Sequence, residues 1–166
     1  MDAKPRETTE PVLEVEGLSV QFRTEHGAVT VVDDVSFEVQ AGETLGIVGE
    51  SGSGKTVTSL AVMGLVDRPG RISGGAVRLQ GTDLTKLARR ELEDVRGKQM
   101  AMVFQEPMTS LNPAFTVGQQ VAETIQRHTG VSRREAWDRA VWWLDRVGIP
   151  NAASRAKNFP HEFSGG

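Results

Sequence analysis

The chain has 166 residues, of which 38% are hydrophobic and 25% charged, a composition typical of a folded domain rather than of a disordered segment. Its 19 basic and 22 acidic residues give a net charge of −3, so no overall positive charge would draw it to nucleic acid or to anionic lipid. The absence of cysteine excludes a disulfide framework and a thiolate metal site, and it fits a reducing compartment such as the cytosol.

The N-terminal segment, residues 1–11, is expected to be a flexible tail. It is polar and charged, so it has the composition of neither a signal peptide nor a membrane anchor. The longest uncharged apolar stretch, Val57–Val66, is too short to cross a bilayer, which needs about 20 residues. Any association with a membrane is therefore expected to run through another protein.

Alternating apolar residues predict antiparallel strands at the start of the chain. Leu13–Phe22 alternates and is rich in β-formers, and a turn is expected at Glu25–Gly27. Residues 29–39 continue the period of two that is typical of a half-exposed sheet. Beyond the next glycine turn, Thr44–Gly49 is short, apolar and bounded by glycine, which predicts a strand buried on both faces.

Helices and strands are then expected to alternate, so the sequence predicts an α/β fold. In chain order these elements are a helix at Lys55–Val66, a strand at Gly75–Gly81, a short charged helix at Lys86–Arg96 and a second buried strand at Met100–Gln105. Two more helices follow. One is expected at Thr116–His128, and the other begins at Ser132, which has capping-box spacing to Glu135.

The segment GESGSGKT, residues 49–56, has the spacing of a phosphate-binding loop between a predicted strand and a predicted helix. Gly49 and Gly54 permit backbone angles that turn N–H groups inward around phosphate oxygens. Lys55 offers a positive charge to the β and γ phosphates, and the Thr56 hydroxyl can ligate Mg²⁺. The remaining loop residues expected to contact ATP are Ser51, Gly52 and Ser53. The alternative is a glycine-rich turn with an unrelated lysine.

A phosphate-binding loop alone does not separate kinases, GTPases and transport ATPases, but the strands that precede it do. With them, the sequence resembles the nucleotide-binding subunit of an ATP-binding cassette (ABC) transporter. The resemblance implies a P-loop core with an N-terminal antiparallel β subdomain and a helical subdomain, and with the C-terminal part missing. It places the β subdomain and core at about residues 12–105, and the Q-loop and helical subdomain at about 105–166.

Two further residues match positions that the family uses at the nucleotide. Phe22 in LSVQFRT matches the aromatic residue that stacks on adenine, although an ordinary core position is the alternative. Gln105 matches the Q-loop glutamine, which by this resemblance is catalytic with Lys55 and reaches Mg²⁺ and the attacking water. Without this resemblance, a single glutamine after a predicted strand would not indicate a catalytic or metal-binding role.

The closing FSGG resembles the start of the ABC signature, LSGGQ, with Phe163 in place of leucine. In the family this segment binds the γ-phosphate of the ATP held by the opposite subunit, in a head-to-tail dimer. Ser164, Gly165 and Gly166 are the matching residues, and a flexible chain end is the alternative.

The sequence around these motifs resembles that of oligopeptide, dipeptide and nickel importer ATPases, above all in FQEPMTSLNPAFTVGQQ, residues 104–120. That resemblance implies integral-membrane permease partners and indirectly a solute-binding protein. The permease contact would be Met108–Phe115, although the composition of this segment would equally suit an ordinary surface loop. It places the protein at the cytoplasmic face of the membrane. The motifs do not identify the cargo.

The family continues past the signature into a strand ending in Asp-Glu, which holds Mg²⁺ and polarises water, and into a switch histidine. His26, His128 and His161 have neither metal-ligand spacing nor that context. The 166-residue chain is therefore expected to bind ATP without hydrolysing it, because phosphoryl transfer depends on those groups. Two alternatives to the importer subunit remain, a non-catalytic nucleotide-binding fragment and a soluble ABC ATPase of repair or translation.

Overall fold

The structure is a computed structural model that describes residues 10–104 and 110–163. Two compact units divide the chain, Met1–Glu93 and Asp94–Gly166. The expected division between core and helical subdomain near Gln105 falls in a segment outside the described residues and stays a prediction.

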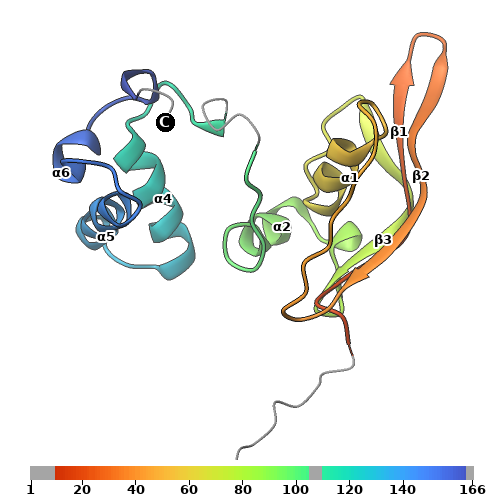
Figure 1. Cartoon of the computed structure of the whole chain (residues 1–166), viewed down its shortest axis with the longest axis horizontal. Coiled ribbons are helices and arrows are strands. Elements are labelled where there is room, and N and C mark those ends of the chain that lie inside the picture. The colour runs from red at the N-terminus through yellow and green to blue at the C-terminus, as the bar shows by residue number, and fades with distance from the viewer. Residues whose placement is uncertain (1–9, 105–109, 164–166) are drawn as a thin grey trace, which may run out of the picture. The chain divides into compact units, whose positions relative to one another are not determined.

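A four-stranded antiparallel sheet forms the first unit, with the strand order β2-β1-β3-β4 (Figure 1). The first two strands, β1 (Leu13–Thr24) and β2 (Gly27–Val39), form the predicted hairpin. On the other edge of β1 lies β3 (Gly70–Leu79), followed by the two-residue β4 (Thr82–Asp83). The third strand begins earlier than predicted, because Gly70 pairs with Phe22 and extends the ladder.

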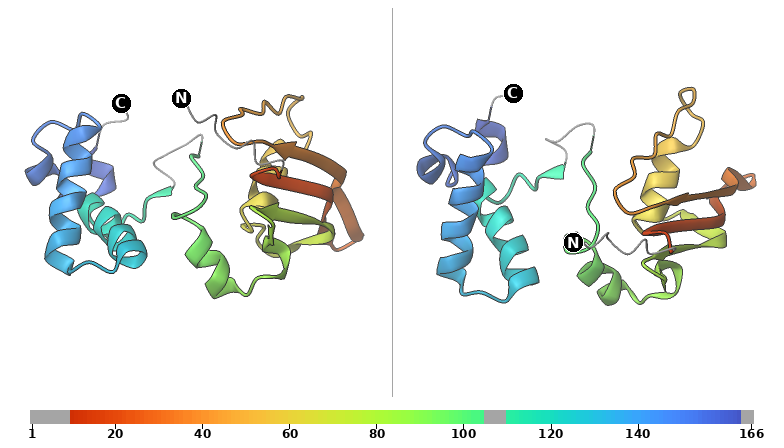
Figure 2. Two further views of the ribbon diagram at one scale, coloured as in Figure 1. Left: turned by 90° about the horizontal axis from the view of Figure 1, so that it is seen from below. Right: turned by 60° about the horizontal axis from the view of Figure 1, so that its bottom comes forward.

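Helix α1 (Lys55–Val62) packs against one face of this sheet (Figures 1 and 2). Thr58 and Ala61 are its buried residues. The buried sheet residues of this unit include Val15, Leu18, Val20, Val32 and Val77. The helix is shorter than predicted, because the Leu65 N–H donates to the Leu60 carbonyl at 2.7 Å and closes the last turn.

The predicted charged helix at Lys86–Arg96 divides into a 3-10 turn, η1 (Leu84–Lys86), and α2 (Arg89–Val95). Asp83 caps η1, accepting hydrogen bonds from the Thr85 amide at 3.0 Å and the Thr85 hydroxyl at 2.6 Å. These hydrogen bonds, with the Lys86 ammonium, lower the pKa of Asp83.

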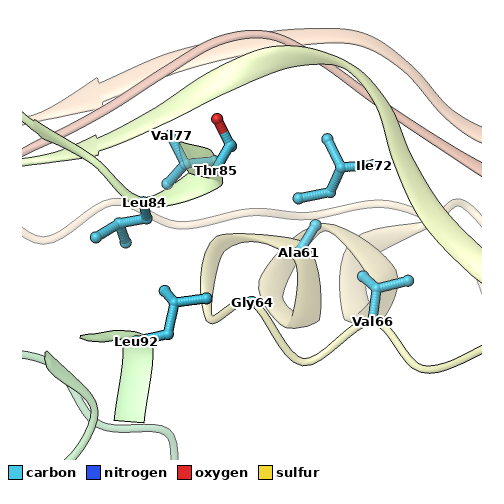
Figure 3. A pocket seen from close by; sticks show the side chains of 8 residues that line it. All are labelled: Ala61, Gly64, Val66, Ile72, Val77, Leu84, Thr85 and Leu92. Carbon is cyan, nitrogen blue, oxygen red and sulfur yellow. The ribbon is translucent and has the colours of Figure 1, made fainter. Parts of the chain in front are cut away.

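A small cavity of about 220 Å³ lies between α1, β3, η1 and α2, and its lining is mostly aliphatic (Figure 3). Its walls include Ala61, Ile72, Val77, Leu84 and Leu92. Thr85 brings the one hydroxyl among the lining side chains.

Both predictions of a buried strand are wrong in this structure. Residues 44–49 and 100–104 have no strand assignment, and the second stretch makes only an isolated bridge between Arg96 and Met100. Val48 is 93% exposed and Val103 is 95% exposed. The physical reason is pairing: a parallel strand is held by ladders on its neighbours, and no described residue forms a ladder with either stretch.

The second unit contains two helices that lie side by side, α4 (Val117–Thr129) and α5 (Arg133–Arg146) (Figure 2). Both helices were predicted, and both begin at a capping residue. Thr116 accepts from the Gln119 amide at 3.3 Å, and Ser132 accepts from the Glu135 amide at 3.2 Å. Ala122, Ala136 and Ala140 are buried where the helices meet.

Two elements of this unit were not predicted, the short helix α6 (Ala152–Arg155) and the 3-10 turn η2 (Pro160–Glu162). The end of α6 bonds to the start of α4 through the backbone: the Gly118 amide donates to the Ala156 carbonyl at 2.8 Å. A second cluster packs there, with Val117, Leu144 and Ala152 among its buried residues. Within the described parts of the chain, no helix is long and apolar enough to span a membrane.

Candidate functional site

The candidate site lies where residues 49–54 lead into the first turn of α1. The Lys55 ammonium donates to the Gly49 and Glu50 carbonyls, both at 2.7 Å, and to the Ser53 hydroxyl at 3.3 Å. These acceptors are neutral, and no carboxylate in the described part of the chain forms an ion pair with Lys55. The loop therefore presents a full positive charge without a full negative partner.

The loop backbone lies close against the sheet at Gly54, the residue that caps α1. Gly54 has φ 89°, in the left-handed region, and a Cβ added there would lie 2.9 Å from the Val31 carbonyl oxygen of β2. Gly52 has a similar φ of 83°, but nothing lies within 4 Å of its Cβ position. Of the two glycines predicted to need special backbone angles, Gly54 has a left-handed φ and Gly49 does not; a Cβ added to Gly49 would instead lie 2.7 Å from the Ser53 hydroxyl oxygen.

The first turn of α1 is suited to an anion. It has no acidic residue, and the N–H groups of Lys55 and Thr56 have no intrahelical acceptor, because the first intrahelical bond runs from the Thr58 amide to the Gly54 carbonyl. The Ser53 amide is already used, donating to the Glu50 carbonyl at 3.2 Å. The helix dipole and these N–H groups add to the charge of Lys55, so the loop can hold a phosphate group.

The side chains after Lys55 fit a Mg²⁺ ion through Thr56. The hydroxyls of Thr58 and Ser59 bond back to the Gly54 and Lys55 carbonyls, at 3.0 and 3.1 Å. Thr56 is exposed, and its hydroxyl forms no hydrogen bond with a described residue. Among those same residues, no group of three or more His, Cys, Asp or Glu side chains could hold a metal ion. Of the two residues predicted to reach Mg²⁺, Thr56 and Gln105, only Thr56 lies in the described part of the chain.

Phe22 is half-buried in β1 and packs on its own sheet. A Cβ added to Gly70 would lie 2.7 Å from the Phe22 Cε1 atom and 2.7 Å from the Val66 Cγ1 atom. The ring edge therefore covers Gly70, which is the packing role weighed for this residue, while part of the side chain is left accessible.

The other predicted site residues, Gln105, Ser164, Gly165 and Gly166, lie outside the described residues. The turn before Ser164 is described, and it is held by side chains. The Arg155 guanidinium stacks on the Phe163 ring at 4.5 Å, and the Phe159 amide donates to the Glu162 carboxylate at 2.6 Å.

The predicted partner-contact segment, residues 108–115, is described from residue 110 onward. The backbone amide of Asn112 donates to the Gln120 side-chain oxygen at 2.9 Å. The side-chain amide of Gln120 donates to the backbone carbonyls of Asn112 and Phe115 at 3.0 and 3.1 Å. These bonds fasten the loop to α4 and leave Phe115 51% exposed. The role of Gln120 was not predicted from the sequence. The T-x-x-Q spacing of Thr116 and Gln119 marks the start of α4, but no local pattern indicates that the Gln120 side chain bonds to Asn112 and Phe115.

Comparison with known proteins gives relatives among importers. The chain is 51% identical over 158 residues to a putative peptide import ATP-binding protein of Brucella abortus (strain 2308), which covers 95% of this chain and 48% of that protein. It is 51% identical over 155 residues to the oligopeptide transport ATP-binding protein OppD of Salmonella typhimurium, covering 93% of this chain and 46% of OppD. The chain thus spans about half the length of the curated relatives it matches.

Solved structures agree on the fold. A dimeric structure of MJ0796, a bacterial ABC transporter cassette, has a TM-score of 0.77 at 22% identity, over 92% of this chain and 63% of that one. A post-hydrolysis structure of the ATP-binding cassette MJ0796, bound to ADP and Pi, has a TM-score of 0.76 at 22% identity, over 92% of this chain and 63% of that one. The ABC transporter family itself matches residues 32–166, and the chain therefore belongs to the ABC transporter family.

Proposed function

We propose that the chain is the ATP-binding part of the energy-coupling subunit of an ABC importer for peptides or related solutes. The observation that carries this proposal is the uncompensated Lys55 ammonium, held over residues 49–54 at the start of α1. Relatives named as peptide import proteins support the importer over a soluble ATPase of repair or translation.

In this proposal the residues of the chain bind and orient ATP. Lys55 and the first-turn amides of α1 hold the phosphates, with the loop backbone of Gly52 and Gly54 turned toward them. Thr56 would hold Mg²⁺, which when bound neutralises charge on the β and γ phosphates. The accessible part of Phe22 would meet the adenine, and Gln105 would orient the attacking water.

The same proposal gives the protein two kinds of partner. Ser164, Gly165 and Gly166 would contact ATP held by a second ATPase subunit in a head-to-tail dimer. The exposed ring of Phe115, on a loop held by Gln120, would contact a permease subunit at the cytoplasmic face of the membrane. A solute-binding protein would act through that permease, and no nucleic acid is expected to take part.

Titration of the complete protein with Mg-ATP by isothermal calorimetry tests the nucleotide site. Lys55→Ala is expected to weaken binding by at least about tenfold, because a charge-assisted contact contributes roughly 1.5–3 kcal/mol. Lys86→Ala is the matched control, since it removes an equally long cation whose partner is Asp83. Equal affinities for ATP in wild type and Lys55→Ala would refute the proposal.

A further inference from the structure

A groove of about 580 Å³ lies between α5 and α6 in the second unit. From α5 it is lined by Asp138, Val141, Trp142 and Asp145, and from the α6 side by residues 151–154. Val141 and Ala152 give it an apolar floor, and both belong to the packed cluster beneath. The groove therefore combines apolar surface with two carboxylates.

The groove has an exposed aromatic wall that the packing of the unit does not use. This wall is Trp142, which is 54% exposed; its ring is in edge contact, at 4.7 Å between centroids, with that of Trp143, which is 51% exposed and is not among the lining residues. Trp137 on the same helix instead packs into both apolar clusters of the unit. Exposed tryptophan is enriched where proteins bind partners, because it offers a large rigid surface at a small entropic cost.

The charge of the groove has one sign. Asp138 and Asp145 stand seven residues apart, two helical turns, and neither forms an ion pair with any residue that the structure describes. Glu135 of the same helix is by contrast paired with Arg139 at 2.6 Å. A second groove, between α4 and α5, is lined by two arginines and one glutamate, so the negative lining distinguishes the groove at α6.

We propose that the groove between α5 and α6 binds a basic segment of a partner polypeptide, with a Lys or Arg side chain placed over Trp142. The cationic head would face the aromatic ring and the carboxylates of Asp138 and Asp145, and the aliphatic stem would cover Val141. This surface is additional to the proposed permease contact at Phe115 and to the nucleotide site. Anionic lipid is the less suitable occupant, since both carboxylates repel its head groups.

Photo-crosslinking of the complete protein in its own cells tests the proposal. A benzophenone amino acid at Ala153, an exposed residue of the groove, leaves Trp142 in place, and the same probe at Arg139 serves as the control position. We expect an adduct at Ala153 with another polypeptide, with a Lys or Arg close to the joined residue. Trp142→Ser and Asp145→Lys should each lower its yield about tenfold, whereas Glu135→Lys should not.

If Asp145→Lys proved unstable, the protein without that substitution would still test the charge complementarity: the yield of the Ala153 adduct should fall as NaCl is added. An adduct with lipid, with another part of the same chain, with a second copy, or with a segment that lacks basic residues would overturn the proposal. So would the absence of any adduct at Ala153, or a yield that neither salt nor charge reversal changes.

Discussion

Replacing Gly54 by alanine tests how the loop ahead of α1 is held. Gly54 has a left-handed φ of 89°, which costs an L-residue roughly 1–2 kcal/mol. The new Cβ would also lie 2.9 Å from the Val31 carbonyl oxygen, a backbone atom that cannot rotate away. Forcing an added methyl into a packed position costs about 1–3 kcal/mol, so Gly54→Ala should destabilise this loop by about 2–5 kcal/mol.

Gly52→Ala separates the two terms. Its φ of 83° gives nearly the same conformational cost, but its Cβ would meet nothing within 4 Å. We therefore expect Gly52→Ala to cost only about 1–2 kcal/mol. The difference between the two variants isolates the contact with Val31.

Mg-ATP titration of the complete protein, together with thermal unfolding followed by circular dichroism, provides the assay. In Gly54→Ala the strain is relieved most easily by moving the loop off β2, so ATP affinity should fall by at least about tenfold, the equivalent of 1.4 kcal/mol. Gly52→Ala should lower ATP affinity less. The reasoning fails if Gly54→Ala binds ATP as well as Gly52→Ala does.

Three further substitutions test other contacts. In Gly118→Ala the Cβ would lie 2.6 Å from the Ala156 carbonyl oxygen, so urea unfolding followed by tryptophan fluorescence should show a loss of about 1–3 kcal/mol; an unchanged midpoint would contradict the contact. Because its folded pKa is lowered, Asp83 adds stability that is present above about pH 4 and lost as the pH falls through that lowered pKa. The stability gap between wild type and Asp83→Asn should therefore close only in acid, and a gap that is equal at neutral pH and near pH 2 would rule this out. Arg155→Lys should lower the free energy of unfolding by about 0.5–1 kcal/mol, because the planar guanidinium no longer stacks on the Phe163 ring. If the effects of Arg155→Lys and Phe163→Ala were strictly additive in a double-mutant cycle, that would argue against the stacking.

Local signals in the sequence predicted much of this fold. The hairpin of β1 and β2 follows from alternation around a turn, and the starts of α4 and α5 follow from capping residues at Thr116 and Ser132. The loop at residues 49–56 also has a local signal, because each of its fixed residue types answers to a backbone or charge requirement within the loop itself.

The parts that were not predicted depend on residues distant in sequence. Helix α6 has only four residues, and its position follows from the Ala156 carbonyl meeting the Gly118 amide across the unit. The hold of Gln120 on Asn112 is likewise a contact across a turn, which composition does not reveal. Neither feature has a periodic pattern long enough to be recognised.

The two mistaken strands show how an apolar run differs from a strand. Thr44–Gly49 and Met100–Phe104 have the composition of buried strands, yet composition gives only the preference for a pleated, enclosed surface. A strand also needs backbone hydrogen bonds to neighbouring strands, and β1 forms them on both edges, with β2 and with β3. Residues 44–49 nonetheless lead into a loop in which Gly54 lies close to the Val31 carbonyl and the Lys55 ammonium donates to the Gly49 and Glu50 carbonyls. In this structure the loop therefore packs on the antiparallel sheet at Gly54, although the apolar run before it forms no ladder with a described residue.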